Sequence, residues 1–417
     1  MFRRILLGVL AGLFLSGRSY AQVESSADSP PLTLNAAVAE AIEQHPALRA
    51  ARAQYEAARS APAQERFLSA PMLEAQIWAW PITTLNPVRT DMYMFMAEQE
   101  LPGKGKRAAR ATVAERDAEL TRQQIPLQAV ELVSEVRQAF VELDVARRAR
   151  TLFAPQRELL RDMTEATTLR YASSSGVGQH DSVASLAELT RLERDAIGAD
   201  ERVATAEAKL NAALGRPLTQ PIGSLAPVTP TVTPADAEQV ALARHPEFAM
   251  VEAMVAREEA ELDRLRGERQ PDFVVGGGYM LMPGEAGALT VRGGVTWPNA
   301  PWSRGRLNAQ LETQIKRVEA AKTRREVVAL KVRRAVREAA IRLDAAQRQA
   351  RLIQSTVLPQ VEHAFELARV AYAGGEGDFS AMLEARRLLF TTRLELVEAE
   401  GSVSRALTEI DTAAGVQ

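Results

Sequence analysis

The longest regular pattern in the chain is helical, with apolar residues recurring every three or four positions among charged ones. One such stretch runs from about Lys106 to Tyr171. At about 1.5 Å per residue it predicts a helix about 100 Å long, whereas the mean helix of a globular domain has about three turns. A shorter helix is expected from about Asn35 to Ser69, with a break at His45-Pro46, and another from about Gln179 to Leu214. These two are expected to stack end to end as the antiparallel partner of the long helix.

Two pairs of strand-length segments interrupt the helical pattern. The first pair is Pro71 to Trp80 with Asp91 to Leu101, and the second is Asp272 to Met282 with Ala288 to Trp297. The last segment alternates strictly between apolar and polar residues, and aromatic residues stand near the segment ends. Such alternation over about ten residues is typical of membrane barrel strands, and amphipathic rings favour the membrane interface. Two soluble hairpins that cap a helical bundle are the alternative.

The chain also repeats itself 200 residues further on. His45-Pro46 recurs as His245-Pro246 and Gly215 recurs as Gly415. Further pairs at the same spacing are Pro71 and Pro271, Gly105 and Gly305, and Leu143-Asp144 and Leu343-Asp344. We therefore divide the mature chain into a first repeat over 22–215, a Pro-rich extended connector over 216–234 and a second repeat over 235–417.

The N-terminus has the pattern of an export signal. Arg3 and Arg4 precede an apolar run that ends at Ser16, and Ser19-Tyr20-Ala21 offers small residues for cleavage before Gln22. We expect a signal peptide over 1–21. No Cys stands at the cleavage point, so no N-terminal lipid anchor is expected.

Composition excludes several kinds of site. The 417 residues include no Cys, and the formal net charge is −2. Disulfides, thiolate metal ligands and thiol nucleophiles are therefore absent from this sequence, and the charge gives no reason to expect nucleic acid as a partner. The 25% of charged residues suit long helices with solvated faces.

Four strands in a chain imply an assembly if they span a membrane. Strand edges cannot be left unpaired in lipid, and the smallest outer-membrane barrels have about eight strands. A dimer supplies eight strands and a trimer twelve; the thickness of the helical wall favours the wider ring.

Several segments together resemble the TolC-like outer-membrane efflux proteins. They are Leu32-Thr33-Leu34 with the Ala-rich helix that ends at His45-Pro46, the run Gln99 to Lys106, and Ala371 to Gly377 followed by Leu383-Glu384-Ala385. The resemblance covers nearly the whole mature chain. It implies a mainly α fold with membrane β: a homotrimer in which four strands per chain form a 12-stranded β-barrel, continuous with a long periplasmic α-helical barrel. It also implies an outer-membrane exit channel of a tripartite efflux system.

The same resemblance assigns roles at the turn ends of the helices. The gate would involve Tyr372, Asp378 and Glu384, whereas Ala381 and Gly377 stand where relatives carry further gating residues. The turns would dock a periplasmic adaptor that carries an inner-membrane pump, often of the resistance-nodulation-division kind; the residues concerned are Tyr171, Gly176, Val177, Gly375 and Gly377. The likeness is closer to the heavy-metal branch than to the drug branch.

Two weaker patterns bear on metal binding. Met92, Met94 and Met96 share one strand face, and thioethers favour Cu(I), although Met is also a plain apolar side chain. His180-Asp181 follows the first turn and is a second candidate for a cation. Neither pattern requires a resident cofactor, and no supported catalytic constellation points to an enzyme.

Three other functions are alternatives to a heavy-metal exit channel. An outer-membrane channel for drugs or other organic solutes has the same architecture. A periplasmic adaptor is built on one helical hairpin flanked by soluble β-rich domains, unlike the two strand-interrupted repeats here. An exported coiled-coil scaffold leaves the strand pairs unexplained.

Overall fold

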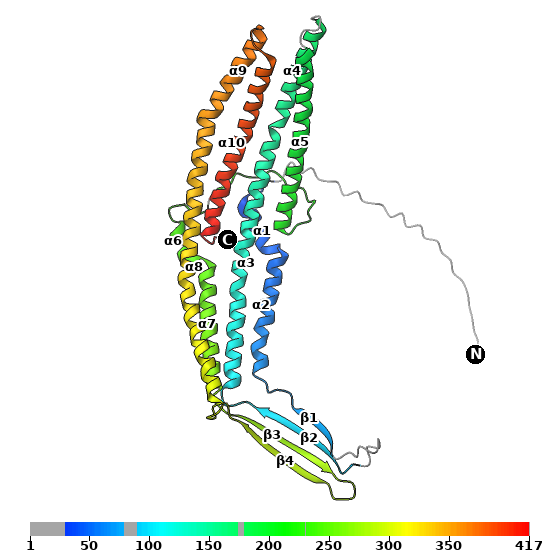
Figure 1. Cartoon of the computed structure of the whole chain (residues 1–417), viewed down its shortest axis with the longest axis vertical. Coiled ribbons are helices and arrows are strands. Elements are labelled where there is room, and N and C mark those ends of the chain that lie inside the picture. Colours follow the sequence, from blue (N-terminus) through cyan, green and yellow to red (C-terminus); the bar gives the residue numbers. More distant parts are fainter. Residues whose placement is uncertain (1–29, 79–89, 174–178, 230, 417) are drawn as a thin grey trace, which may run out of the picture.

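The computed structural model describes residues 30–78, 90–173, 179–229 and 231–416. They form a long curved wall of helices with a small sheet at one end (Figure 1). The expected signal peptide lies outside the described residues, as does most of the loop between the first two strands. Within the described ranges, no helix combines the length and hydropathy that crossing a bilayer requires.

The elements follow the same order in the two halves of the chain. Residues 30–215, the N-terminal half, contain α1 (Leu34–Gln44), α2 (Pro46–Glu65), β1 (Met72–Trp78), β2 (Met92–Leu101), α3 (Lys106–Thr151), α4 (Phe153–Ser173) and α5 (Gln179–Leu214). Residues 235–416, the C-terminal half, contain α6 (Ala237–Arg244), α7 (Pro246–Gly267), β3 (Asp272–Leu281), β4 (Ala288–Thr296), α8 (Arg304–Leu352), a π-helical segment (Ile353–Val357), α9 (Leu358–Gly374) and α10 (Phe379–Ala413).

The predicted helices are confirmed, with one correction to the longest. It is not continuous from 106 to 171, because α3 ends at Thr151 and α4 begins at Phe153. In the C-terminal half the π-helical segment lies at the corresponding position. Pro155 and Pro359 follow these breaks at once, and proline cannot donate to the carbonyl four residues earlier. Pro126, by contrast, lies inside α3 without ending it.

The helices are arranged in four neighbouring columns. α3 and α4 form one column, and it contacts α2 and α5 on one side and α7 and α10 on the other. α8 and α9 form the outer column beyond α7 and α10 (Figure 1). The expected antiparallel partner of the long helix is therefore present twice, as α5 with α2 and as α10 with α7.

The repeated Gly and His-Pro motifs meet in space at the joints of these composite columns. Gly215 and Gly415 end α5 and α10 with positive φ angles of 74° and 70°. A Cβ atom at Gly215 would lie 3.2 Å from Pro46 Cδ, and one at Gly415 would lie 3.1 Å from Pro246 Cδ. His45 caps α2, since its Nδ1 accepts from the Ala47 amide at 3.2 Å. His245 caps α7 in the same way from Glu247, at 3.3 Å. Glycine thus supplies both the left-handed backbone and the space that each joint needs.

Two equivalent apolar cores surround the joints. One lies among α1, α3 and α5 and includes Val133, Phe140 and Leu210; the other lies among α6, α8 and α10 and includes Val332 and Ile410. The connector over 216–234 crosses the wall at this level and pairs with the N-terminal segment through a parallel bridge between Leu32 and Leu225.

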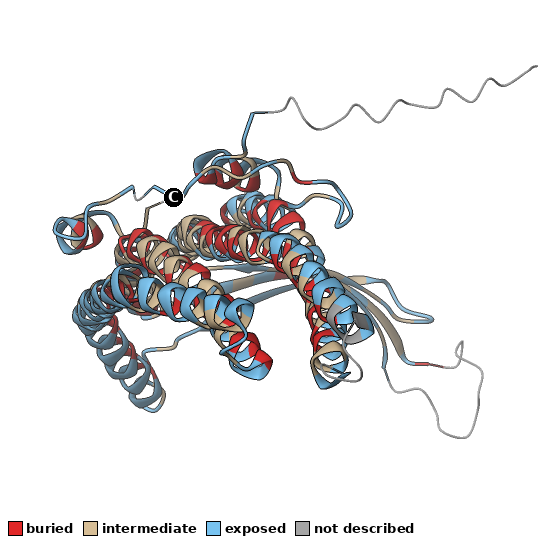
Figure 2. Cartoon of the chain, turned by 90° about the horizontal axis from the view of Figure 1, so that it is seen from above, coloured by how far each residue is buried: buried red, intermediate tan, exposed pale blue. Residues whose placement is uncertain are grey.

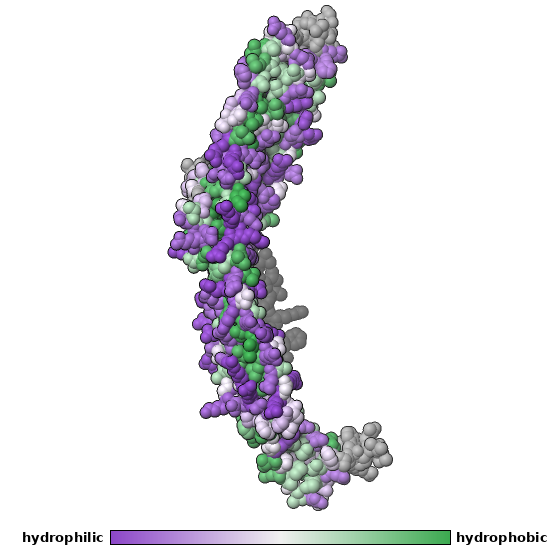
Figure 3. Space-filling view, turned by 60° about the vertical axis from the view of Figure 1, so that its left-hand side comes forward, coloured by the Kyte–Doolittle hydropathy of each residue, from purple (hydrophilic) through white to green (hydrophobic). Residues whose placement is uncertain are grey.

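The four strands form one antiparallel sheet in the order β1-β2-β3-β4. The register places Leu73, Ala97, Gly277 and Val291 side by side on one face. The aliphatic and aromatic residues of this face are largely exposed, at 78% for Leu73, 83% for Leu289 and 86% for Val291. We call it the apolar face; Figure 2 shows the strands mostly in the exposed colour. Figure 3 shows hydrophilic residues over much of the visible helical surface, with apolar patches between them.

Candidate functional site

The far end of the wall from the sheet, which we call the tip, carries the turn between α9 and α10. Gly375 has a φ of 79° and ends α9. The amides of Glu376 and Gly377 both donate to the carbonyl of Ala371 at 3.0 Å. A Cβ atom at Gly377 would lie 2.8 Å from the amide nitrogen of Tyr372. The glycines that the resemblance pointed to therefore fold the chain back tightly just after Tyr372.

Tyr372 joins the two pairs of helices at the tip. Its hydroxyl donates to Oδ2 of Asp181 on α5 at 3.4 Å, and its ring lies 5.3 Å from that of Phe379, centroid to centroid. Phe379 belongs to an apolar cluster that spans both helix pairs and includes Phe153 and Leu192. The tyrosine thus connects α9 to α5 at the edge of an apolar core.

A buried charged cluster lies about two helical turns behind this contact, given 3.6 residues per turn. Arg386 of α10 donates to Oε1 of Glu188 on α5 at 2.8 Å and to Oε1 of Gln156 on α4 at 3.0 Å. Arg387 donates to the other oxygen of Glu188 at 2.5 Å. Arg386 and Glu188 are both buried. We call these four residues the tip cluster.

The charges of the tip cluster hold Glu188 ionised. Burial alone would raise its pKa, but the hydrogen bond from Arg387 and the positive charges of Arg387 and Arg386 lower the pKa below its ordinary value. For Arg386, burial lowers the pKa, yet a guanidinium stays charged at any physiological pH. Breaking such a pair leaves a buried charge without compensation and is strongly destabilising.

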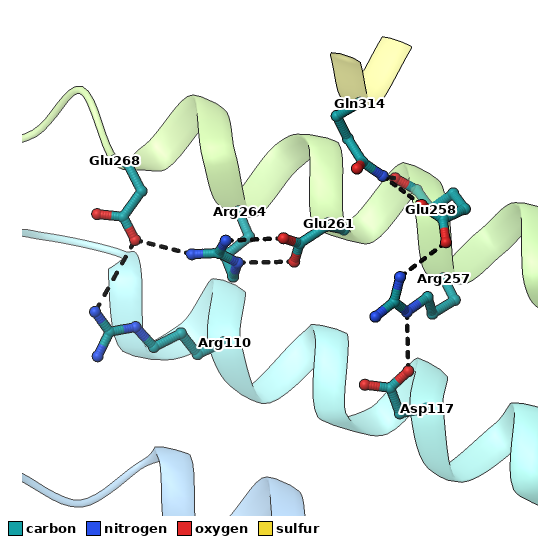
Figure 4. A network of polar contacts seen from close by, with 8 residues as sticks. All are labelled: Arg110, Asp117, Arg257, Glu258, Glu261, Arg264, Glu268 and Gln314. Atoms are coloured by element: carbon teal, nitrogen blue, oxygen red, sulfur yellow. Dashed lines mark hydrogen bonds and ion pairs between the residues drawn. The ribbon is translucent and has the colours of Figure 1, made fainter. Parts of the chain in front are cut away.

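At the opposite end, ion pairs join α3 to α7 where the helices meet the sheet. The side chain of Lys106 is fully buried, and its Nζ lies 2.7 Å from Oδ2 of Asp272 and 2.9 Å from Oε2 of Glu268. Asp272 also accepts from the Gly103 amide at 2.8 Å. Further along, Arg257 of α7 bonds to Asp117 of α3 at 3.0 Å. We call this boundary between α3 and α7 the seam. Figure 4 shows two separate groups of contacts along it: Glu268 and Arg264 lie with Arg110 and Glu261, and Arg257 and Asp117 lie with Glu258 and Gln314.

Comparison with known proteins agrees with this architecture. Residues 238–416 match the family model described as outer membrane efflux protein. The chain is 24% identical over 415 residues to the cobalt-zinc-cadmium resistance protein CzcC of Cupriavidus metallidurans, covering 96% of this chain and 94% of the relative. These matches confirm the predicted resemblance to the TolC-like outer-membrane efflux proteins.

Solved structures of outer-membrane channels have the same fold as this chain. The channel OprN superposes with a TM-score of 0.70 at 19% identity, covering 92% of this chain and 90% of that one. CusC superposes with a TM-score of 0.69 at 18% identity, covering 92% of each chain. The expected fold, mainly α with membrane β, is thereby confirmed, and these relatives are channels rather than enzymes.

The predicted gate residues have different surroundings in the structure. Tyr372 is half-buried in the contact described above, whereas Glu384 is exposed on α10. Asp378 is the N-cap residue of α10, and a hydrogen bond from the Ser380 hydroxyl lowers its pKa. Asp378 therefore has a local role in starting the helix, which the sequence alone did not indicate.

The predicted docking turn of the N-terminal half is described only in part. Gly176 and Val177 lie outside the described residues, and Tyr171 is placed in the last turns of α4. Gly375 and Gly377 form the turn of the C-terminal half. His180 and Asp181, which were predicted as a weak cation site, are neighbours at the tip. The His180 side chain is 86% exposed, and its Nδ1 lies 3.9 Å from Oδ1 of Asp181. Among the described residues no group of three or more His, Cys, Asp and Glu side chains is placed to hold a metal ion.

Three features of the site were not found from the sequence. Asp181 was considered for a metal but contacts Tyr372. Arg386 and Glu188 looked like members of a solvated helix face, because their spacing along each helix does not reveal a partner on another helix. Lys106 was noted only within the run after the second strand, and its acidic partners lie more than 160 positions further along the chain.

Proposed function

We propose that the chain is the homotrimeric outer-membrane exit duct of a tripartite efflux system that removes heavy-metal cations. The main support for this proposal comes from the four-stranded sheet. Its apolar face is exposed and β1 and β4 end it as unpaired edges in the described chain. Lipid requires every strand edge to be paired, so copies of the chain must complete the ring.

A ring of three copies fits the shape of the protomer. Three copies supply twelve strands, above the minimum of about eight in outer-membrane barrels. The helical wall continues directly from the sheet (Figure 1), so closing the sheet into a barrel also closes the wall into a tunnel. The face opposite the apolar one carries Glu74, Glu98 and Arg292, with Arg292 paired to Glu98 at 3.2 Å, and this polar face would line the pore.

The cargo follows from the relative rather than from the fold. CzcC is named for cobalt, zinc and cadmium resistance and is matched over nearly its whole length. Substrate choice would belong largely to the inner-membrane pump. A periplasmic adaptor would dock on the tip at Tyr171, Gly176, Val177, Gly375 and Gly377, and the pump would be of the resistance-nodulation-division kind.

Deletion and complementation test the cargo. A strain that lacks the gene should become sensitive to Co²⁺, Zn²⁺ or Cd²⁺ and should recover with the full-length gene. Sensitivity to organic dyes and detergents without sensitivity to metals would instead favour the drug-type channel. Crosslinking in outer-membrane fractions should give trimers, and a soluble periplasmic monomer would contradict the whole proposal.

The tip would be the gate of this duct, with Tyr372, Asp378 and Glu384 near the constriction. Three copies of the exposed Glu384 around one axis make an acidic ring, which attracts cations. Two unit charges 4 Å apart interact by about 1 kcal/mol in water, which corresponds to a factor of about five in binding.

We therefore expect Glu384→Ala to raise the divalent-cation concentration that blocks single-channel current by about five-fold or more. Glu395→Ala is a matched control, because Glu395 is also exposed on α10 and lies about three turns further from the tip on the same helix face. The control should leave the block unchanged. Equal block in the wild type and the Glu384 variant would contradict the assignment.

A further inference from the structure

The strand methionines all lie on the polar face of the sheet. They are Met72 in β1, Met92, Met94 and Met96 in β2, and Met280 in β3. The register pairs Met94 with Gln76 on one side and with Met280 on the other. The apolar face carries Leu, Ile, Val, Phe and Tyr but no Met in any of the four strands.

This separation is not what plain apolar packing predicts. A Met that served only as an apolar side chain would be expected on the apolar face with the leucines and valines. Instead the thioethers stand on the face that carries Glu74, Glu98 and Arg292 and would line the pore. Placing apolar groups along a water-filled lumen gives no burial in lipid, so another interaction should favour them there.

Three of these methionines are neighbours on the polar face. Met94 and Met280 are directly opposite, which puts their Cβ atoms about 4.5–5.5 Å apart. Met96 is the next residue on the same face of β2 and is paired with Gly278. A Cβ atom at Gly278 would lie 2.8 Å from Cγ of Met96. The Met96 side chain therefore occupies the space over Gly278, which neighbours Met280 on this face of β3.

The chemistry of this group selects a class of ion. Thioethers are soft ligands that favour Cu(I), and Ag(I) is a soft cation of the same charge. Glu74 is paired with Met96 from the other side and offers a carboxylate next to the sulfur atoms. Conduction along an exit path requires that a bound cation can also leave its site. Neutral thioethers bind a cation without adding negative charge to the site, which allows the cation to be released.

We propose that Met94, Met96 and Met280 form a thioether site for a soft monovalent cation, Cu(I) or Ag(I), on the pore-lining face of the sheet. The proposal rests on the proposed exit duct and extends its cargo beyond the divalent metals in the name of the relative. Three chains would place three such sites around the pore.

Silver titration of the full-length trimer tests the site. Wild-type trimer in lipid nanodiscs, in a chloride-free nitrate buffer, should bind about one Ag(I) per chain by calorimetry. The variant with Met94→Leu, Met96→Leu and Met280→Leu keeps similar side-chain volume but removes three sulfur atoms. Changes beside the ligands alone cost about 10–100-fold in metal affinity, so loss of three ligands should weaken binding by about 100-fold or more.

A matched control replaces three methionines of the helices. Met163, Met250 and Met254 are half-buried on α4 and α7, and their change to Leu should leave Ag(I) binding as in the wild type. Equal binding by the wild type and both variants would overturn the thioether site.

A spectroscopic measurement covers the case in which the strand variant does not assemble. Wild-type trimer with selenomethionine in place of Met should give Ag–Se scattering at the selenium edge when Ag(I) is added, and its absence would overturn the site. Single-channel conductance separates the two proposals. A conducting trimer that shows no Ag–Se contact refutes only the thioether site, whereas a chain that neither conducts nor complements the deletion refutes the duct itself.

Discussion

The two halves of the chain are joined in different ways at the two ends of the wall. Near the sheet, two groups of charged residues join α3 to α7. One surrounds Glu268, which pairs with the buried Lys106 and with Arg110. The other pairs Asp117 with Arg257 (Figure 4). Near the tip, α5 and α10 share one compact cluster centred on Glu188 and Arg386. Beyond that cluster, the joining hydrogen bond from Tyr372 to Asp181 is long, at 3.4 Å.

This difference indicates which parts of the protomer resist motion. Many paired charges along a seam fix the register of two helices, because sliding either helix breaks several bonds at once. Among the described residues of the tip, the helix pairs are joined by the tip cluster, by the apolar residues around Phe379 and by the long hydrogen bond of Tyr372, and we expect the last turns to separate more easily than the helices at the seam. In the proposed duct, we therefore expect the protomer to be rigid next to the sheet and to open at the tip.

The largest effect is expected from breaking the seam near the sheet. Lys106→Ala removes a fully buried ammonium and leaves Glu268 and Asp272 facing each other. Removing one partner of a buried pair costs about 3–5 kcal/mol, so trimers should dissociate at a clearly lower temperature in heat-modifiability gels. Arg306→Ala is the control, since Arg306 corresponds to Lys106 in the C-terminal half but is exposed. Similar losses in both variants would argue against a special role for the seam.

A smaller effect, confined to the tip, is expected from Glu188→Ala. Loss of the carboxylate leaves Arg386 buried without its anion, which should destabilise the tip by about 3 kcal/mol. The channel should conduct more often in planar bilayers and be cleaved faster by protease at the tip, while trimers keep their heat stability. Glu193→Ala, an exposed change on the same helix, should behave like the wild type.

The same carboxylate gives the tip a dependence on pH. The folded-state pKa of Glu188 is lowered from the ordinary value of 4.5, so its stabilising contribution is complete above that value and is lost as the pH falls through the folded pKa. Opening of the wild-type tip should therefore increase on acidification below about pH 4.5. Glu188→Gln should lack this increase, and an unchanged pH profile in that variant would contradict the assignment.

The smallest effect is expected from the terminal hydrogen bond. Tyr372→Phe keeps the ring against Phe379 but removes the donor to Asp181. A typical hydrogen bond contributes about 0.5–1.5 kcal/mol, and the 3.4 Å length puts this one at the low end. We expect about a two-fold rise in open probability. Tyr55→Phe on α2 serves as the control, and a larger effect there than at Tyr372 would refute the gating role.

Much of the architecture could be predicted from local patterns. The helix and strand segments follow from periodicity, whereas the break at Leu152 does not, because the spacing of apolar residues continues across it and a proline inside a helical pattern does not always end the helix, as Pro126 shows. The paired motifs Gly215 and His45-Pro46 were recognised as repeated, but their contact was not foreseen. A spacing of 200 residues reveals a duplication and does not say that the end of one helix meets the start of another.

The tip was harder to predict because its interactions join distant segments. Tyr372 and Glu384 were found through the family resemblance, whereas Glu188 and Arg386 each resemble any charged residue on a helix. Their burial results from the packing of α10 against α4 and α5, which no single helix encodes. Likewise, Met94 and Met280 belong to different halves of the chain, and only the strand register places them opposite each other.

The joints at Gly215 and Gly415 also have an electrostatic consequence. α5 runs from the tip to the joint and α2 runs on from it toward the sheet, so the negative end of one helix dipole faces the positive end of the next. This head-to-tail alignment is favourable, because the partial charges at the two helix ends are opposite in sign. α5 and α2 thereby act as one long dipole, directed against that of α3 and α4 beside it. A column made of two pieces can in this way offset the field of its neighbour along almost the whole length of the wall.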